Sequence, residues 1–311
     1  LYSRRRAKFF INKTDVDIII GFKSYKSHNI INLNECSILD QNILNILEPC
    51  RKIFNQNLKK NDQITMSINV LDEGLDILVR FNTKYNPFDF NFSSFFLDAK
   101  NISRMSLQYK DKEPDLIGHF NSSKLFLQDK KTYMLPPPGG FFQATKIAEK
   151  IIIDEILLYF NETKQLKILD LFSGCGTLSL PLLNKQHYVF AIDINESSIR
   201  NLVTAAKEQN LFNKLKFKSL NLMKKKLENE FLKSFDVVII DPPRAGAKMQ
   251  ISSIAEAKVP RVISISCNVK SFLSDCKILI DKGYKLKSIT PIDQFLYTGH
   301  LETLGIFEIE S

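Results

Sequence analysis

The segment that most constrains the fold spans residues 167–183 and reads KILDLFSGCGTLSLPLL. It predicts a buried strand at 168–172, a tight turn at 173–176 and a helix that opens at Thr177. The two glycines of the turn let the backbone bend sharply and approach a ligand where a Cβ would intrude. A turn of this kind delivers a ligand to a helix N-terminus. An ordinary strand-to-helix turn that happens to contain two glycines is the alternative.

A second carboxylate, at the tip of the next strand, indicates the type of ligand. Residues 188–192 form another short apolar strand, and Asp193 follows it where it can accept hydrogen bonds from ribose hydroxyls. Ser179 stands where a dinucleotide fingerprint has its third glycine, so that G-x-G-x-x-G pattern is incomplete. Asp170, just before the turn, would repel a pyrophosphate but suits a cationic amino-acid group. These residues favour S-adenosylmethionine over NAD.

Length and composition limit the classes of protein. With 311 residues, of which 44% are apolar and 25% charged, the chain is long enough for two globular domains. It has neither a signal peptide nor an apolar run of about 18 residues, so we expect no membrane anchor. Five cysteines without CxxC spacing indicate a reducing compartment, and we expect a cytoplasmic protein. The chain begins at Leu1 rather than at a methionine, so we expect that an N-terminal piece is missing.

The net charge of +9 favours an anionic polymer as partner, because lysine and arginine neutralise phosphates. Asn, Ile and Lys are all abundant, as in an A/T-biased coding sequence, and this bias would raise the lysine content without a functional reason. The densest basic patch is YSRRRAK at residues 2–8. It is either a phosphate-contacting surface or a solvated edge.

Two domains are expected, with the boundary at the Pro-Pro-Pro-Gly-Gly segment 136–140. In the first domain, alternating runs at 9–33 predict hairpins, and apolar spacing predicts a helix at 38–47. Strands at 63–71 and 75–81 are joined by an Asp-Glu-Gly turn, which is a strong hairpin signal. We expect an accessory α+β domain over residues 1–135 and a second domain over residues 136–311.

From residue 166 onward, strands and helices alternate, which predicts a doubly wound, mostly parallel sheet. The last two strands have no helix between them, so one of them should be antiparallel. Ligands of such sheets bind at the carboxyl ends of the strands, where Asp170, Asp193, Asp241 and Cys267 fall. The strands are predicted at 168–172, 188–192, 215–218, 236–240, 261–266, 284–292 and 301–309, and the helices at 146–159, 177–184, 196–209, 224–232, 248–258 and 270–281.

Two polar residues at predicted element ends are candidates for ligand contacts. Asp241 follows the strand at 236–240 and begins an Asp-Pro-Pro-Arg loop, which its prolines make rigid. Asp241 is a site residue or a structural cap, and Arg244 binds phosphate or orients an acidic group. Gln143 lies at the start of the helix predicted at 146–159, as a cap-region amide or as a hydrogen-bond partner of the ligand.

Cys267 ends the strand at 261–266, and the helix that follows would stabilise its thiolate. The alternative is buried apolar filler, which is how we interpret Cys50, Cys175 and Cys276. Glu302 lies at the start of the strand predicted at 301–309, as a strand-edge charge or as a base. A thiolate, a base and a methyl donor form a complete set for methylating a pyrimidine carbon. The thiolate adds to C6, C5 takes the methyl, and the base removes the C5 proton before the thiolate leaves.

The ordered motifs FFQAT, DLFSGCGTLSLPL, DPPRAGA, SISCN and GHLET resemble the RNA 5-methyluridine (uracil-C5) methyltransferase family over residues 136–311. The resemblance implies an α/β fold: a Rossmann-like, class I S-adenosylmethionine-dependent methyltransferase domain with an N-terminal α+β RNA-binding domain. It implies Cys267 as nucleophile and Glu302 as base. It also implies a set of S-adenosylmethionine contacts, namely Gln143, Phe172, Thr177, Asp193, Asn221 and Asp241.

The N-terminal part resembles one branch of this family. Residues 2–9 resemble the start of its central RNA-binding domain, and ECSIL at 35–39 resembles the region of an isolated cysteine in the iron–sulfur branch, which methylates 23S rRNA. Cys36 would then ligate a 4Fe-4S cluster, provided that the partner cysteines lie upstream of Leu1 together with a small β-barrel domain. An unpaired core cysteine is the alternative. We expect RNA as partner, rRNA rather than tRNA, no membrane, and a monomer.

The leading hypothesis is therefore an S-adenosylmethionine-dependent RNA uracil-C5 methyltransferase that acts on a flipped uridine. The same C5 chemistry on tRNA is one alternative. Another is an amino-group methyltransferase of RNA or DNA that uses the Asp241-Pro-Pro loop. Such enzymes usually carry an aromatic residue where Arg244 stands, and they need neither Cys267 nor Glu302. The third alternative is an RNA-binding or folding factor with a vestigial cofactor fold.

Overall fold

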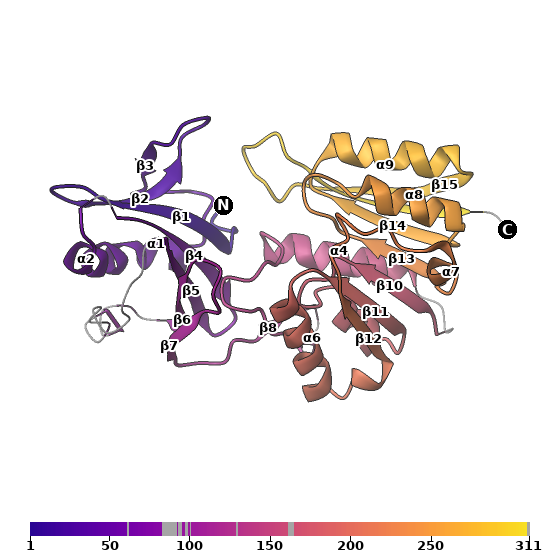
Figure 1. Ribbon diagram of the computed structural model, residues 1–311, viewed down its shortest axis with the longest axis horizontal. Helices are drawn as coiled ribbons and strands as arrows, with labels where there is room; N and C mark the ends of the chain where they lie inside the picture. The colour runs from indigo at the N-terminus through magenta and orange to yellow at the C-terminus, as the bar shows by residue number, and fades with distance from the viewer. Residues whose placement is uncertain are drawn as a thin grey trace. The chain divides into compact units, whose positions relative to one another are not determined.

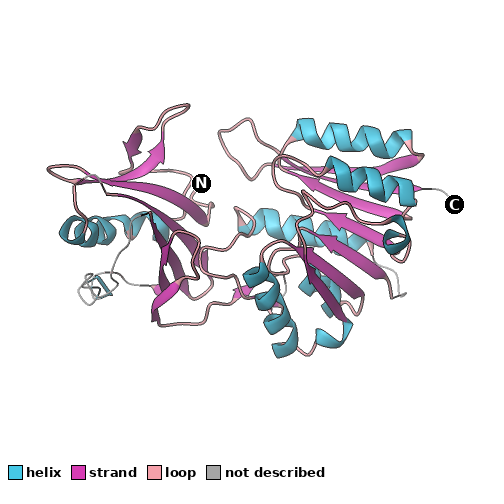
Figure 2. Ribbon diagram, in the orientation of Figure 1, coloured by secondary structure: helices cyan, strands magenta, loops and turns pink. Residues whose placement is uncertain are grey.

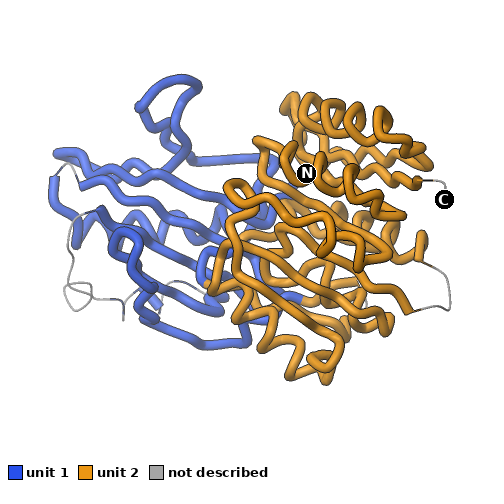
Figure 3. The backbone as a smooth tube through the Cα atoms, turned by 45° about the vertical axis from the view of Figure 1, so that its right-hand side comes forward, with its two compact units in different colours: residues 1–125, 138–140 blue, residues 126–137, 141–311 orange. Residues whose placement is uncertain are grey.

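The computed structural model describes residues 1–60, 62–82, 92, 95–96, 99, 101–128, 130–160 and 165–309. The chain divides into two compact units, drawn in different colours in Figure 3. Unit 1 comprises residues 1–125 and 138–140, and unit 2 comprises residues 126–137 and 141–311. The domain boundary expected between residues 135 and 136 falls inside the segment 126–137.

Side-chain hydrogen bonds explain why the segment 126–137 belongs to unit 2. The backbone of Tyr133 donates to Gln209 Oε1 at 3.1 Å and accepts from Gln209 Nε2 at 2.8 Å. Asn201 Nδ2 donates to the Leu135 carbonyl at 2.8 Å. Gln209 caps helix α6 (Glu196–Glu208), which also carries Asn201. Because these partners are distant in sequence, no local sequence pattern predicts that the segment 126–137 binds to α6.

Unit 1 contains a seven-stranded sheet in the order β3-β2-β1-β4-β5-β6-β7, in which only β5 and β6 run parallel. Helices α1 (Gln41–Asn45) and α2 (Leu47–Asn57) pack through their apolar residues on one face (Figures 1 and 2). The strands are β1 (Arg6–Lys13), β2 (Ile18–Lys23), β3 (Ile30–Asn32), β4 (Gln63–Leu71), β5 (Gly74–Phe81), β6 (Ile102–Tyr109) and β7 (Asp115–His119).

The predictions for this unit are confirmed in part. The hairpin of β4 and β5 forms as expected, with Leu71 and Gly74 paired across its turn. The single helix predicted at 38–47 is wrong, because α1 and α2 divide between Asn45 and Leu47. Pro49 lies in the first turn of α2, where its lack of an N–H donor is tolerated. A proline at this position cannot continue the helix that precedes it, because it cannot donate the helical hydrogen bond.

The segment 138–140 is fixed to unit 1 by a buried carboxylate on β5. Asp76 is fully buried, and its Oδ1 accepts from Arg104 Nε at 2.8 Å. Its Oδ2 accepts from the Gly139 amide at 2.9 Å and from Asn69 Nδ2 at 3.4 Å. Asn69 Nδ2 also donates to the Gly140 carbonyl at 3.0 Å. Asp76 therefore joins three elements of unit 1.

We expect Asp76→Ala to destabilise unit 1 by about 3–5 kcal/mol, because it removes the carboxylate from a buried ion pair and from two further donors. Urea unfolding followed by fluorescence or circular dichroism would measure the loss. Asp111→Asn, at an exposed position after β6, is the control and should cost about 0.5 kcal/mol or less. Equal stabilities of Asp76→Ala and the control would contradict this account.

Unit 2 contains a second seven-stranded sheet, in the order β12-β11-β10-β13-β14-β16-β15, with helices on both sides (Figures 1 and 2). The strands are β10 (Lys167–Leu171), β11 (Tyr188–Asp193), β12 (Leu215–Ser219), β13 (Val237–Ile240), β14 (Arg261–Ser266), β15 (Tyr284–Ile292) and β16 (Glu302–Ile309). The helices besides α6 are α4 (Lys146–Tyr159), α5 (Ser179–Asn184), η2 (Phe212–Lys214), α7 (Asn229–Leu232), α8 (Lys248–Ala257) and α9 (Val269–Asp281), and a short ribbon pairs β8 (Leu125–Phe126) with β9 (Tyr133–Met134).

The predicted α/β sheet is confirmed: β10 to β14 run parallel, and β16 is antiparallel to both β14 and β15. Two helix predictions are wrong at their starts. The helix expected from Thr177 begins at Ser179, after a longer turn. The helix expected at 224–232 is only α7, because the side chain of Gln250 donates to the carbonyls of Leu222 and Lys225 and holds that stretch as a loop.

The parallel strands lie in the interior of unit 2 because their sequences are continuously apolar. Val237–Ile240 is fully buried, as are Ile168, Leu169 and Leu171 of β10. Helices α7, α8 and α9 pack over one face through a common apolar cluster. None of the described helices is long and apolar enough to cross a bilayer.

Candidate active site

The carboxyl ends of the parallel strands form one edge of the unit 2 sheet, here called the strand edge. Leu171 at the end of β10 is level with Ile192 of β11 and Ile240 of β13. The chain proceeds from β10 to β11 and β12 on one side, then returns to β13 and β14 on the other. A ligand crevice is expected where the strand order reverses, between β10 and β13.

Cys267 and Glu302 lie side by side at this edge. Strands β14 and β16 pair so that Ser266 is opposite Thr303. Cys267 directly follows Ser266 and Glu302 directly precedes Thr303, so each lies one residue beyond this last pair, and the two groups interact electrostatically. Cys267 is half-buried and Glu302 is 3% exposed. The sheet thus brings together a thiol and a carboxylate that are distant in sequence.

The electrostatics of this pair favour the protonated forms. Burial raises the pKa of Cys267, and the charges of Glu302 and Asp241 raise it further, whereas Arg244 opposes them. Burial and Asp241 raise the pKa of Glu302 to about 8, against a hydrogen bond from Gln294. Stabilisation of the Cys267 thiolate by the N-terminus of α9 remains a prediction. Desolvation and the two carboxylates act against the thiolate.

The turn after β10 has the backbone that its glycines allow. Phe172, Gly174 and Gly176 have φ of 62°, 55° and 96°. A Cβ on Gly176 would lie 2.5 Å from Leu202 Cδ1, whereas a Cβ on Gly174 would meet no atom within 4 Å. The Gly174 amide donates to Asp193 Oδ2 at 2.9 Å. Asp193, the last residue of β11, thus fixes the position of Gly174 in the turn.

Two buried polar atoms near this turn have no partner among the described residues: Asp170 Oδ1 and Ser173 Oγ. Asp170 is 1% exposed, and its other oxygen accepts from Ser179 Oγ at 2.5 Å. Burial raises the pKa of Asp170 to about 7, and Asp241 and Asp193 add to the shift. A buried oxygen without a donor is costly, so the position suits a ligand that brings an N–H donor and positive charge.

A chain of amides connects the candidate site residues. Gln143 Nε2 donates to Asp241 Oδ2 at 3.3 Å, and Gln294 Nε2 donates to Gln143 Oε1 at 3.0 Å. Gln294 Nε2 also donates to Glu302 Oε2 at 2.7 Å. Gln294 is not among the predicted site residues. The predicted strand order indicated only that the loop joining the last two strands returns to the edge that holds Cys267, and it did not indicate the partners of Gln294.

The other predicted contacts are dispersed along the same edge. Phe172 directly follows β10 and is half-buried. Thr177 Oγ1 lies 3.4 Å from the Sδ of Met134, which is also 3.5 Å from Cys175 Sγ. Cys175 is buried in this contact, as expected of a packing residue. Asn221 follows β12, and its side chain accepts from the Met223 amide at 3.0 Å.

Cys36, the predicted iron–sulfur ligand, lies in unit 1 and is half-buried. Within the described part of the chain, no group of three or more His, Cys, Asp or Glu side chains could hold a metal ion. One thiolate does not hold a 4Fe-4S cluster. The described residues alone therefore do not form the cluster site.

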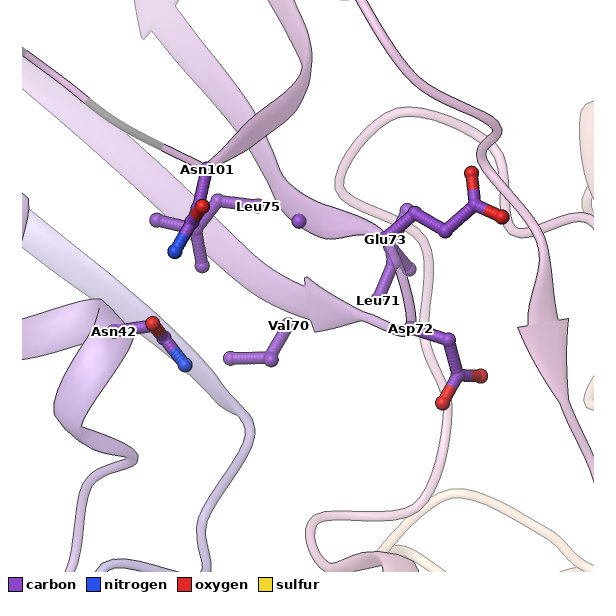
Figure 4. Close-up of a pocket in the computed structure, with 8 residues that line it drawn as sticks. Asn42, Val70, Leu71, Asp72, Glu73, Leu75 and Asn101 are labelled. Atoms are coloured by element: carbon purple, nitrogen blue, oxygen red, sulfur yellow. The ribbon is translucent and has the colours of Figure 1, made fainter.

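Unit 1 has a cavity of about 330 Å³ beside the β4–β5 turn, shown in Figure 4. Asp72 and Glu73 of the turn, Asn42 of α1 and Asn101 contribute its polar groups. Glu73 Oε2 accepts from the Ser122 amide at 3.1 Å, which gives this carboxylate a structural partner. None of the residues that line the cavity is a predicted site residue.

Comparisons with known proteins decide between the hypotheses. The family model described as tRNA (Uracil-5-)-methyltransferase matches residues 108–310. The chain belongs to this family. It is therefore an S-adenosylmethionine-dependent RNA uracil-C5 methyltransferase, which confirms the leading hypothesis and not the amino-group alternative.

Relatives of this uracil-C5 methyltransferase cover nearly its whole length. An uncharacterised RNA methyltransferase of Mesorhizobium japonicum is 30% identical over 307 residues, which are 99% of this chain and 72% of the relative. The 23S rRNA (uracil(1939)-C(5))-methyltransferase RlmD of Aliivibrio fischeri is 28% identical, over 98% of this chain and 69% of its own.

A solved structure shares the fold. The Pyrococcus abyssi tRNA (uracil-54, C5)-methyltransferase in complex with S-adenosyl-L-homocysteine aligns with a TM-score of 0.74 and 20% identity. The alignment covers 98% of this chain and 76% of that one.

We expect Glu302→Gln to make Cys267 more reactive toward iodoacetamide, by about 3- to 10-fold above the pKa of Glu302, because the negative charge that raises the thiol pKa is lost. Mass spectrometry of the Cys267 peptide at a series of pH values would show the labelling curve moving to lower pH. Glu308→Gln, at the other end of β16, is the control and should leave the curve in place. An unchanged or higher labelling midpoint in Glu302→Gln would contradict this arrangement.

Proposed function

We propose that this methyltransferase modifies C5 of a uridine with Cys267 as nucleophile and Glu302 as base. The observation that carries the proposal is the β14–β16 register, which sets the thiol beside the carboxylate at the strand edge. The two groups are also coupled electrostatically to Asp241 on the neighbouring strand end. A nucleophile and a base within reach of one ring are what C5 methylation needs.

The proposed reaction has three steps: addition of the thiolate, methyl transfer and elimination. The Cys267 thiolate forms a bond to C6, and the C5–C6 π electrons move toward C5 and the O4 carbonyl as an enolate. C5 then takes the methyl group that S-adenosylmethionine supplies when bound, and the methyl–sulfur bond breaks with its electron pair going to sulfur, which leaves a neutral thioether. Glu302 removes the C5 proton, the electrons of that C–H bond restore the C5–C6 double bond, and the C6–S bond breaks to release the thiolate.

The residues of the strand edge fit a cationic methyl donor. Asp170 offers a buried oxygen without a donor, as an ammonium group of an amino acid requires. Asp193, at the end of β11, is placed for ribose hydroxyls. Gln143 and Asp241 contribute an amide and a carboxylate at the end of β13. We assign the remaining contacts, as the family resemblance implies, to Phe172, Thr177 and Asn221.

We propose rRNA as the substrate, in preference to tRNA. This choice is supported by the relatives, since RlmD of Aliivibrio fischeri is named for a uracil of 23S rRNA. Incubation with 23S rRNA and tRNA transcripts, followed by mass mapping of 5-methyluridine, tests it. Methylation of tRNA alone would overturn the choice of RNA and leave the chemistry intact.

RNA that carries 5-fluorouridine at the target should form a stable covalent adduct with the protein, because the C5 fluorine cannot be abstracted. Denaturing electrophoresis would show the adduct as a slower band that forms only with S-adenosylmethionine present. Cys267→Ser should abolish it, whereas Cys36→Ser, which removes a half-buried cysteine of unit 1, should not. Methyl transfer that persists in Cys267→Ser would refute the nucleophile.

On unmodified RNA, Glu302→Gln should accumulate a methylated protein–RNA adduct, because an amide cannot take the C5 proton. Loss of a general base slows a step by about 10²–10⁴-fold. The measurement is single-turnover kinetics with methyl-labelled cofactor, in which label passes into the protein–RNA band. Normal turnover of this variant would mean that another residue is the base.

The outer face of the unit 1 sheet supports a role in holding RNA. On β1, Phe9 and Ile11 point into the core, so Lys8, Phe10 and Asn12 alternate onto the other face. A cavity of about 640 Å³ lies there. Its lining includes the Phe10 ring with Lys23 Nζ 4.5 Å from the ring centroid, and the amides of Asn12, Gln63 and Asn82. An aromatic ring beside a lysine and several amides suits an unpaired base and its phosphate.

We expect the double variant Phe10→Ala/Lys23→Ala to raise KM for RNA by about tenfold with little change in kcat, because base–aromatic stacking is worth ~1–3 kcal/mol. The affinity for S-adenosylmethionine should not change. Tyr25→Ala/Lys26→Ala removes a second ring–lysine pair, on the β2–β3 loop, and is the control. Equal losses in both double variants would indicate general charge attraction in place of a base-binding cavity.

A further inference from the structure

Gln294 lies in the loop 293–301 between β15 and β16 and is only 2% exposed. Its side chain uses all of its strong hydrogen-bonding groups. Oε1 accepts from the Ala144 backbone amide at 3.1 Å, and Nε2 donates to Gln143 Oε1 and Glu302 Oε2. A buried amide satisfied in this way has one orientation.

The polarity of this network follows from a single backbone group. The N–H of Ala144 is only a donor, so the oxygen of Gln294 must face it. The NH₂ of Gln294 then faces Glu302 and the oxygen of Gln143. Gln143 must in turn present its own NH₂ to Asp241. The direction of every donor is therefore fixed by the segment that precedes helix α4.

We propose that Gln294 is a positioning residue for the base: it holds one carboxylate oxygen of Glu302 so that the other is left to take the C5 proton. The proposal rests on the assignment of Glu302 as base in the proposed function. It goes further in naming the residue that orients that base, and in linking the base to Gln143 and Asp241 through one amide.

Among the described residues, Glu302 interacts electrostatically with the Asp241 carboxylate and the Cys267 thiol and accepts a hydrogen bond from the Gln294 amide. The first raises the pKa of Glu302, and the hydrogen bond from Gln294 lowers it, because it stabilises the charged form. Loss of Gln294 therefore has two consequences. The carboxylate is no longer oriented, and its pKa rises, so a smaller fraction is ionised at neutral pH.

Gln294→Met keeps the volume and removes every hydrogen bond of this side chain. We expect proton abstraction to slow by on the order of 10²-fold, as for a misplaced catalytic group. Methyl transfer should persist, so a methylated protein–RNA adduct accumulates. The pH dependence of adduct breakdown should move to higher pH, because the base titrates at higher pH without the amide.

A matched control is available in the same unit. Gln250 is fully buried, accepts from the Leu227 amide at 3.3 Å and donates to two carbonyls at 2.7 Å each. Gln250→Met should lower stability in the same way but accumulate no adduct. Gln294→Asn, which keeps an amide but is too short to reach Glu302, is the second test variant and should stall at the same step with less loss of stability.

The outcomes separate this proposal from the proposed function. If Gln294→Met and Gln294→Asn break down the adduct at the wild-type rate and with the wild-type pH profile, while Glu302→Gln accumulates it, the positioning role is wrong and the base assignment stands. If Gln250→Met accumulates adduct as well, the effect is general destabilisation and the positioning role is also wrong. If Glu302→Gln turns over normally, the proposed function itself fails.

Discussion

The site depends on the concentration of buried carboxylates at one edge of a parallel sheet. Burial raises the pKa values of Asp170, Asp241 and Glu302. Neighbouring carboxylates raise those of Asp170 and Glu302 further, whereas a side-chain hydrogen bond to each of the three lowers its pKa. In the protein alone this arrangement is unfavourable, since like charges are desolvated together. A ligand with two positive groups, such as S-adenosylmethionine with its ammonium and sulfonium, relieves it. The Cys267 thiol shares this environment, and its pKa is raised by burial and by the charges of Glu302 and Asp241.

This view gives the order of events a physical basis. The positive charge of the cofactor would lower the pKa values of the neighbouring carboxyl and thiol groups, so the proposed nucleophile would ionise when the methyl donor is in place. Arg244 lowers the pKa of the Cys267 thiol, but its effect is smaller than those of burial, Glu302 and Asp241. The neutral product S-adenosylhomocysteine would lose part of this attraction, which favours its release.

Much of this site could be predicted from the sequence because continuous apolar runs end in polar residues at the strand edge. The runs before Phe172, Asp193, Asp241 and Cys267 are local signals, and the parallel sheet brings their ends together. The role of Gln294 could not be predicted, since it depends on a loop between two strands and on a backbone amide at residue 144. Nor could the attachment of residues 126–137 to α6, which uses two side-chain amides. The single helix predicted at 38–47 is wrong because Pro49, in the first turn of α2, cannot continue the helix that precedes it.

The most direct test of the central claim is a double-label measurement on RNA that carries tritium at C5 of its uridines. Methyl groups transferred from labelled S-adenosylmethionine and tritium released to water are counted in the same reaction. Chemistry through Cys267 and Glu302 predicts equal numbers of methyls gained and tritium atoms released, with both absent in Cys267→Ser. Methyl incorporation with the tritium retained would contradict the account, because the methyl would then lie on another atom.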